Sequence, residues 1–519
     1  MLFERSRQIQ QLEEVTTWDV LVIGGGATGL GIALEAATRG YKTLLLEQED
    51  FAKGTSSRST KLVHGGVRYL SQGDIKLVRE ATVERGLLYR NAPHLVKNQQ
   101  FIIPVYTHFD QWFYTVGLKL YDWISGRLSM GPSGSISRQE TLKRLPGIEP
   151  HKLVGGVVYH DGQFDDSRLA INLFQTIIKN GGTAINYCKV TGLTKTQSKV
   201  SGVKAIDAET GKAYVLQATT VINATGVFVD DILKMDEAGK PNTICVSQGV
   251  HVIVDKKFYA SSTALMIPKT SDGRVLFAVP WHNKVILGTT DTPVDNPSLE
   301  PRALEKEISF ILNTAGTFLT HKPTRADVLS VYAGLRPLAV PQGESKKTKE
   351  ISRSHKIILS PSGLYTILGG KWTTYRKMGE DMVDKIEKRT NKHSTSITGT
   401  LKIYGYTQQV DFKDPFYFYG CDAFEITNHA AREPNGWISR KLQIHQQQVL
   451  WAVSHEMART VEDVLSRRTR ALLLDAEESI CMAPIVANLM AEYFKYDEQW
   501  IKEQVKSYTE LAKKYLINP

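Results

Sequence analysis

Residues 19–29 have the sequence DVLVIGGGATG, and this stretch decides the fold class. The apolar run that ends at Ile23 is typical of a parallel strand that is buried on both faces. Gly24, Gly26 and Gly29 follow it with the G-x-G-x-x-G spacing that joins a strand to a helix in dinucleotide-binding folds. The first glycine permits the tight turn, the second lets the backbone approach a pyrophosphate, and the third lets the helix pack on the strand.

The residues after this loop complete a strand-helix-strand unit. We expect a helix from Thr28 to Arg39 and a second strand over residues 42–47. The N-terminus of the helix offers free N–H groups and a partial positive charge to a pyrophosphate. Glu47, at the end of the second strand, can accept hydrogen bonds from ribose hydroxyls. This motif alone leaves open whether the nucleotide is NAD or FAD.

Two later strands, at residues 220–224 and 364–368, favour a flavin. Small residues after the first would let a dinucleotide lie against the sheet, and the second opens a helix whose N-terminus could stabilise a reduced flavin. Plain turns are the alternative interpretation of these glycines. The residues expected to contact the cofactor here are Ala224, Gly226, Gly370 and Thr373.

Residues 54–70 are rich in small hydroxyl side chains beside paired glycines. Such a segment can wrap closely around an extended cofactor and hydrogen-bond to it, whereas a polar surface loop is the plainer alternative. The cofactor contacts expected in this segment are Thr55, Ser56, Ser57, Lys61, His64 and Gly65.

The length of 519 residues exceeds what one hydrophobic core usually serves, and the strand motif returns after unrelated material. We therefore expect an α/β chain with an inserted domain. An FAD-binding, doubly wound (Rossmann-like) domain would comprise residues 17–85, 150–245 and 330–390. An inserted α+β substrate domain would comprise residues 86–149 and 246–329, and a C-terminal all-helical domain residues 400–519.

The net charge is +10, from 64 Lys and Arg against 54 Asp and Glu, which suits acidic ligands, anionic lipid or nucleic acid. No zinc-finger or basic-zipper spacing and no stacking groove occurs, so we expect no nucleic-acid partner. The four cysteines are far apart and have no histidine at metal-ligand spacing, which predicts reduced thiols and no metal. There is no secretory signal and no apolar stretch of the roughly 20 residues that span a bilayer, so any membrane contact should be peripheral.

Several motifs together resemble FAD-dependent glycerol-3-phosphate dehydrogenases of the aerobic, quinone-linked type. They are the glycine loop, residues 55–69, residues 332–338 (YAGLRPL), residues 369–376 (GGKWTTYR) and, in the tail, residues 455–468. The resemblance covers nearly the whole chain. It implies an enzyme that oxidises sn-glycerol 3-phosphate to dihydroxyacetone phosphate by hydride transfer to FAD and passes the electrons to a membrane quinone.

The resemblance also implies roles for basic residues. The positions that match the family's phosphate grip are Arg68, Tyr69, Arg353 and Lys371. Cations, and arginine above all, suit the dianion of a phosphomonoester. His251 matches a histidine near the substrate and is expected as the general base, with a hydrogen-bonded core histidine as the alternative. Arg336 matches an arginine whose charge would stabilise the developing alkoxide, and His64 is the reserve candidate for the base.

Residues 112–124 are aromatic-rich and amphipathic, with basic flanks at Lys119 and Arg127. A helix there either lies on a lipid surface and gathers quinone, or is a core helix of the substrate domain. We expect a cytoplasmic protein at the inner face of the cell membrane, and a homodimer remains open. There are two alternatives to a dehydrogenase. The chain could be a glycerol-3-phosphate oxidase that releases hydrogen peroxide, or a flavin-containing binding protein without turnover.

Overall fold

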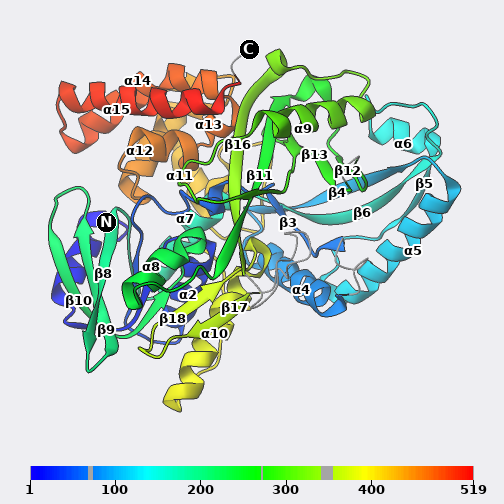
Figure 1. Cartoon of the computed structure of the whole chain (residues 1–519). Helices are drawn as coiled ribbons and strands as arrows, with labels where there is room; N and C mark the ends of the chain where they lie inside the picture. Colours follow the sequence, from blue (N-terminus) through cyan, green and yellow to red (C-terminus); the bar gives the residue numbers. More distant parts are fainter. Residues whose placement is uncertain (1, 68–73, 271–272, 340–354, 518–519) are drawn as a thin grey trace.

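Two β-sheets and a C-terminal set of helices make up the molecule (Figure 1). The fold comes from a computed structural model of the chain, which describes residues 2–67, 74–270, 273–339 and 355–517. The chain passes several times between the two sheets, so each sheet combines strands that are far apart in the sequence.

The first sheet has eight strands among the described residues, in the order β17-β18-β10-β1-β2-β7, and β9 and β8 extend it from β10. The strands are β1 (Thr17–Ile23), β2 (Thr43–Leu46), β7 (Thr183–Ile185), β8 (Cys188–Thr196), β9 (Lys199–Asp207), β10 (Ala213–Asn223), β17 (Lys356–Leu359) and β18 (Tyr365–Leu368). Strands β18, β10, β1, β2 and β7 are parallel to one another. This confirms the predicted Rossmann-like fold.

The register of the parallel strands brings their carboxyl ends to one edge of the sheet. Ile23 at the end of β1 lies opposite Leu46 of β2 and Asn223 of β10. The residues that follow these three ends are Gly24, Glu47 and Ala224. Ligands of open parallel sheets bind at this edge.

Helices cover the first sheet and fix its geometry. They are α1 (Arg5–Glu14), α2 (Ala27–Thr38), α7 (Asp166–Lys179), α8 (Val229–Asp236) and α10 (Tyr375–Thr390). Helix α2 packs against both α7 and α10. At the crossing with α10 two glycines meet, and a Cβ added to Gly379 would lie 2.4 Å from the carbonyl oxygen of Gly31. This close approach sets where the N-terminus of α10 lies.

The second sheet has ten strands among the described residues and is mostly antiparallel. The strands are β3 (Leu62–Val63), β4 (Val96–Val105), β5 (Gly134–Ser137), β6 (Gly155–Phe164), β11 (Ile244–Asp255), β12 (Ala264–Ile267), β13 (Leu276–Trp281), β14 (Lys284–Gly288), β15 (Thr292–Val294) and β16 (Val328–Ala339). The helices beside it are α4 (Ile75–Asn91), α5 (His108–Ser125), α6 (Arg138–Arg144) and α9 (Glu305–Phe318).

The positions of strands β6 and β16 do not follow the expected domain boundaries. Strand β6 and all but the first two residues of β16 fall in stretches expected in the nucleotide-binding domain, yet β6 pairs with β4 and β16 pairs with β11 in the second sheet. Apolar periodicity predicts a strand but not its partner, which here comes from a distant part of the chain. The division of the chain at residues 150 and 330 therefore does not coincide with the division between the sheets.

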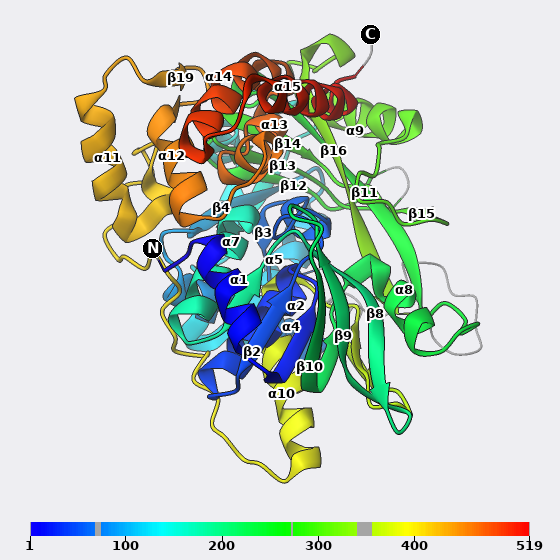
Figure 2. The same ribbon diagram turned by 90° about the vertical axis from the view of Figure 1, so that its left-hand side faces the viewer.

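The C-terminal region packs over the second sheet, with α14 and α15 outermost (Figure 2). Its helices are α11 (Ala423–Arg432), α12 (Gln446–His455), α13 (Ala471–Leu474), α14 (Ala476–Phe494) and α15 (Glu498–Ala512), with a π-helical turn over Asp463–Arg468. It is not purely helical, because β19 (Trp437–Ser439) and β20 (Ile444–His445) form a small antiparallel pair.

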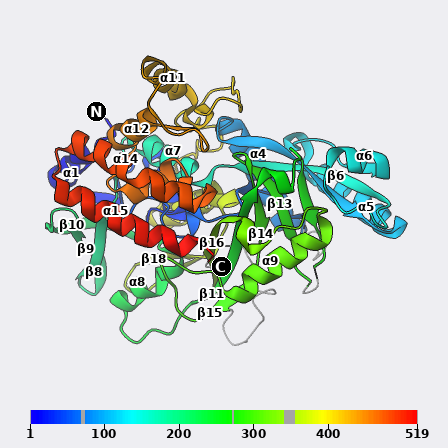
Figure 3. The same ribbon diagram turned by 90° about the horizontal axis from the view of Figure 1, so that it is seen from above.

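Helix α5 lies at the edge of the molecule, far from the C-terminal helices (Figure 3). Its buried residues are Leu118, Tyr121 and Ser125. Large apolar side chains on the rest of the helix are exposed, and the exposed fraction reaches 78% at Trp123. Helix α5 is therefore amphipathic, with one face packed against the second sheet and the opposite face exposed. Among the described residues, the structure has no helix that is both long and apolar enough to cross a bilayer.

The α2–α10 crossing gives a prediction for stability. Gly379→Ala should lower the free energy of unfolding by about 1–3 kcal/mol, because the new methyl group would overlap backbone atoms of α2. Gly117→Ala in α5 is the matched control, since its Cβ would meet nothing within 4 Å and alanine favours a helix. Chemical denaturation measures both. Equal stability of the two variants would contradict the close crossing.

Candidate active site

A cavity of about 760 Å³ lies where the two sheets meet. On one side it is lined by the ends of the parallel strands, including Gly24 and Glu47. On the other side it is lined by residues of β11 and β16, including His251 and Arg336. The residues predicted to bind a nucleotide and those predicted to act on a substrate therefore share one cavity.

Most of the predicted site residues that the structure describes line this cavity. They are Gly24, Gly26, Glu47, Thr55, Ser56, His64, Ala224, Gly226, His251, Arg336, Gly370, Lys371 and Thr373. Gly29, Ser57, Lys61 and Gly65 are not among the lining residues. The predicted substrate contacts Arg68, Tyr69 and Arg353 lie outside the described residues.

The glycine loop has the close contacts that its spacing predicts. Gly24 has a φ of +107°, and a Cβ there would lie 2.8 Å from the carbonyl oxygen of Ala224. A Cβ on Gly29 would lie 1.9 Å from the carbonyl oxygen of Gly24, so that only glycine lets α2 pack this closely on β1. Gly26 is the N-cap of α2 and faces the cavity. The loop thus aims a helix N-terminus at the cavity.

Glu47 caps this loop as well as facing the cavity. Its Oε2 accepts a hydrogen bond of 2.6 Å from the Gly25 amide, and Oε1 accepts one of 2.9 Å from the Glu49 amide. Burial raises the pKa of Glu47 to about 7, although the hydrogen bonds from Glu49 and Gly25 act in the opposite direction. Glu47 therefore stands where a nucleotide ribose would meet it, and it also fixes the loop.

Ser56 joins three parts of the wall. Its hydroxyl accepts a hydrogen bond of 2.9 Å from the amide of Ala27, in the first turn of α2. Its carbonyl accepts one of 2.8 Å from the indole of Trp372, which precedes α10. The hydroxyl of neighbouring Thr55 donates to the carbonyl of Leu335 in β16. The hydroxyl-rich segment thus connects both sheets and both helix N-termini.

Lys61 has a supporting position instead of a place on the cavity wall. Its side chain is fully buried, and its ammonium donates to both carboxylate oxygens of Asp166 at 2.7 and 2.8 Å. It also donates to the carbonyl of Ser57 at 2.7 Å. Ser59 binds the same carboxylate through its hydroxyl and amide. This ion pair anchors the hydroxyl-rich segment to the first turn of α7.

His251 is buried in the second sheet beside the cavity. Its ring stacks on Tyr332 with centroids 4.9 Å apart, and its Nε2 shares a hydrogen bond of 2.8 Å with the hydroxyl of Thr60. Nδ1 is buried and has no hydrogen-bond partner among the described residues. Burial, Arg336 and Lys61 lower the pKa of His251 well below its ordinary value. The imidazole is therefore neutral at neutral pH and can accept a proton.

Arg336 lies beside His251 and faces the same cavity. Its guanidinium donates to the Thr290 carbonyl at 3.1 Å and to the Thr289 hydroxyl at 3.2 Å. A Cβ on Gly249 would lie 2.2 Å from Arg336 Nη2, so the guanidinium passes directly over this glycine. Gly249 and His251 are two residues apart on β11 and so share a face of the sheet.

Sequence reasoning missed Thr60, Gly249 and Gly288. A Cβ on Gly288 would lie 2.4 Å from Cδ2 of His251, so this glycine makes room for the imidazole. Glycines inside strands do mark close approaches, and that signal was available for both positions. No local pattern pointed to Thr60, because its partner His251 is 191 residues away.

The cavity fits an extended dinucleotide. It meets an open helix N-terminus at Gly26 and an acidic residue at Glu47, the two features that bind a pyrophosphate and a ribose. It also has open space where a side chain is missing, because a Cβ at Gly226 would meet nothing within 4 Å. Gly370 and Thr373, at the turn that leads into α10, face the same space.

Comparisons with known proteins agree with this site. Residues 19–376 match the family described as FAD dependent oxidoreductase, and residues 365–501 match the C-terminal domain of alpha-glycerophosphate oxidase. The chain is 37% identical to the mitochondrial glycerol-3-phosphate dehydrogenase of Homo sapiens, over 99% of this chain and 75% of that protein. It is 36% identical to that of Schizosaccharomyces pombe, over 95% and 87%.

A solved structure agrees as well. The glycerol-3-phosphate dehydrogenase from Bacillus halodurans complexed with FAD superposes with a TM-score of 0.81 at 30% identity, and the match covers 99% of this chain and 98% of that one. Sequence and fold thus agree along nearly the whole chain. The chain belongs to the FAD-dependent oxidoreductases and, within them, to the glycerol-3-phosphate dehydrogenase family.

Proposed function

We propose that this chain binds FAD and oxidises glycerol 3-phosphate to dihydroxyacetone phosphate. The observation that carries the proposal is the position of His251 and Arg336 on one face of the second sheet, in the cavity that also contains the glycine loop. A base and a fixed cation are what the oxidation of an alcohol requires at its carbinol group. The names of the relatives supply the substrate.

The substrate phosphate is proposed to lie near Lys371. This residue lines the cavity at the start of the turn that leads into α10. Arg68, Tyr69 and Arg353 are proposed to complete the phosphate grip, on the basis of the sequence alone. A dianion is held best by several cations, since each contributes charge-assisted hydrogen bonds.

When FAD is bound, it supplies the acceptor for the hydride of the substrate carbon. His251 takes the proton of the hydroxyl at that carbon, for which its lowered pKa keeps the ring neutral. Arg336 stabilises the negative charge that develops on the oxygen as the proton leaves. The hydroxyl of Thr60 orients the imidazole through its hydrogen bond with Nε2.

The electron acceptor is proposed to be a quinone in a membrane on which α5 lies. Six apolar side chains of α5 recur at helical spacing on its outer face, Phe109, Trp112, Phe113, Val116, Leu120 and Trp123, and all are exposed. Lys119, between Val116 and Leu120 on the same helix, is exposed, and the chain carries a net charge of +10, which favours an anionic bilayer. We place the protein at the inner, cytoplasmic face of this membrane, and its four free cysteines suit that compartment.

Anaerobic reduction tests the function. The holoprotein should lose its flavin absorbance when glycerol 3-phosphate is added and should keep it with glycerol, which lacks the phosphate. His251→Ala should bleach at least about 100-fold more slowly, the usual contribution of a general base. A flavin that stays oxidised with glycerol 3-phosphate would favour a binding protein. Stoichiometric peroxide on admission of air would favour the oxidase.

Removal of the Thr60 hydroxyl should slow the same step. Thr60→Val should lower the rate of flavin reduction by about tenfold or more, because the imidazole loses its one hydrogen bond among the described residues. Thr60→Ser, which keeps the hydroxyl, is the control. Wild-type rates in Thr60→Val would contradict this role.

The lowered pKa of His251 predicts the pH dependence of the wild type. The rate of flavin reduction should fall on acidification only below pH 6.5, because a base with a lowered pKa stays deprotonated to lower pH.

The lipid-facing role of α5 has its own test. The double variant Trp112→Ser/Trp123→Ser should bind anionic vesicles at least about tenfold more weakly than the wild type, because each buried large apolar side chain contributes about 1.5–3 kcal/mol. Phe424→Ser is the matched control, since Phe424 is 76% exposed but lies on α11. Sedimentation at low and high salt measures the bound fraction. Equal binding by both variants would exclude α5 as the contact.

A further inference from the structure

Residues 47–54, between β2 and the hydroxyl-rich segment, contact the cavity on one side and the C-terminal region on the other. Glu47, Gln48, Ala52, Lys53 and Gly54 line the cavity. Asp50 points the other way, into the contact with the C-terminal helices, and is completely buried. The amide of Ala52 donates to the carbonyl of Gly25 at 3.0 Å, so this segment is also tied to the glycine loop.

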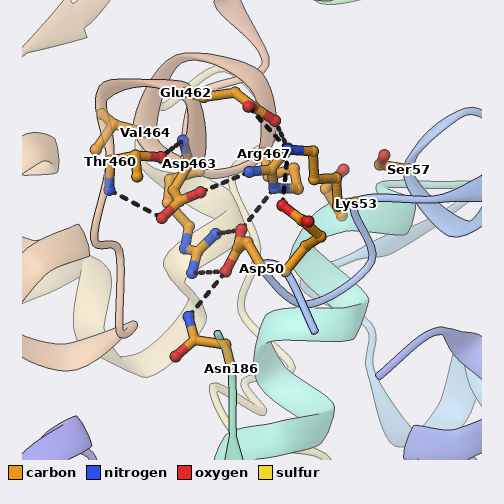
Figure 4. Close-up of polar contacts among 12 residues, drawn as sticks. Asp50, Lys53, Ser57, Asn186, Thr460, Glu462, Asp463, Val464 and Arg467 are labelled. Carbon is orange, nitrogen blue, oxygen red and sulfur yellow. Dashed lines mark hydrogen bonds and ion pairs between the residues drawn. The ribbon is translucent and has the colours of Figure 1, made fainter. Parts of the chain in front are cut away.

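Two consecutive arginines of the C-terminal region hold Asp50, and Figure 4 labels one of them, Arg467, beside the carboxylate. Nε of Arg467 donates to Oδ2 at 2.5 Å, and Arg468 donates to both carboxylate oxygens, with 2.9 Å to Oδ1. Asn186 adds a hydrogen bond of 3.2 Å to Oδ1. Burial alone would raise the pKa of Asp50, but Arg468 and Arg467 more than offset it and hold the pKa at about 2. The carboxylate is therefore ionised and fully paired.

A second contact reaches the cavity wall from the same turn. Glu462 accepts a hydrogen bond of 3.1 Å from the ammonium of Lys53, which lines the cavity, and one of 2.8 Å from Arg467. Arg467 also donates to Asp463 at 2.6 Å. We call Asp50, Lys53, Glu462, Asp463, Arg467 and Arg468 the junction cluster, and Lys53 pairs in addition with Glu49 at 3.1 Å.

The two arginines stand at the end of an irregular turn. Arg467 and Arg468 both reach Asp50, and they are the last two residues of the π-helical turn Asp463–Arg468. Arg468 also donates to the carbonyl of Glu456 at 2.6 Å, which anchors it within the C-terminal region. Such π-turns are frequent at functional sites.

We propose that the C-terminal region retains the cofactor. In this proposal Arg467 and Arg468 act as positioning residues: through Asp50 they hold residues 47–54 and the attached glycine loop in the conformation that closes on FAD. The inference rests on FAD binding as proposed above, and it assigns a task to the region beyond the catalytic sheets. Its consequence is that the rate of FAD release depends on residues that do not touch the cavity.

The test compares two buried arginines at the same junction. Arg468→Lys keeps the charge but cannot bridge both oxygens of Asp50. Arg168→Lys is the control, because Arg168 forms an equally buried bidentate pair at 2.6 and 2.8 Å with Glu456, which Arg468 also contacts, but it does not bind Asp50. Neither Arg168 nor any other residue of its helix α7 lines the cavity. Release of FAD is followed as a rise in flavin fluorescence after dilution of the holoproteins. Circular dichroism and the unfolding midpoint of each apoprotein are measured alongside.

Arg468→Lys should release FAD at least about tenfold faster than the wild type, the effect of losing one charge-assisted hydrogen bond. Arg168→Lys should stay within about threefold, and excess FAD should restore the wild-type rate of flavin reduction in Arg468→Lys. If Arg468→Lys does not fold, Asn186→Ala, which removes a neutral donor to Asp50, should still release FAD faster than Arg168→Lys.

Equal release from Arg468→Lys and Arg168→Lys would overturn the inference, because it would show only a general effect of domain docking. Wild-type release from a folded Arg468→Lys would overturn it too. Neither result would affect the proposed function, which is judged by bleaching of the wild-type protein. A wild-type protein that binds no FAD would overturn both.

Discussion

The parallel pairing of β1 with β2 on one side and β10 on the other is the constraint on which the site depends. Its register places Gly24, Glu47 and Ala224 at one edge, and the glycine at position 29 lets α2 begin immediately behind that edge. The strands are buried on both faces, so their order and register are fixed by packing and not by the loops. A slip of one residue would move Glu47 away from the Gly25 amide that it caps.

Two glycines of the second sheet make room for the side chains that are proposed to act on the substrate. Gly249 and Gly288 have no side chains where the guanidinium of Arg336 and the imidazole of His251 lie. Both groups thus lie against bare backbone, the imidazole fully buried and the guanidinium partly exposed, where electrostatic interactions are stronger than in bulk water. Burial of His251 lowers its pKa, so that the imidazole stays neutral to a lower pH than an ordinary histidine.

Buried ion pairs connect the three regions of the molecule. The pair of Lys61 with Asp166 supports the hydroxyl-rich segment. The pair of Asp50 with Arg468 joins residues 47–54, which precede that segment, to the C-terminal region. Such pairs add little net stability compared with apolar packing, but the loss of one partner costs about 3–5 kcal/mol because a buried charge is left unpaired. They therefore specify one arrangement of the segments that surround the cavity.

The sequence by itself determined the nucleotide-binding unit, because the apolar strand, the glycine spacing and Glu47 all lie within about thirty residues and each acts locally. Only the tertiary structure decided that β6 and β16 belong to the second sheet, that Lys61 pairs with Asp166, and that nothing within the described residues covers the aromatic face of α5. These features depend on partners far away in the chain. A local pattern shows that a strand, a cation or an apolar face exists, but what lies against it is set by how distant segments pack.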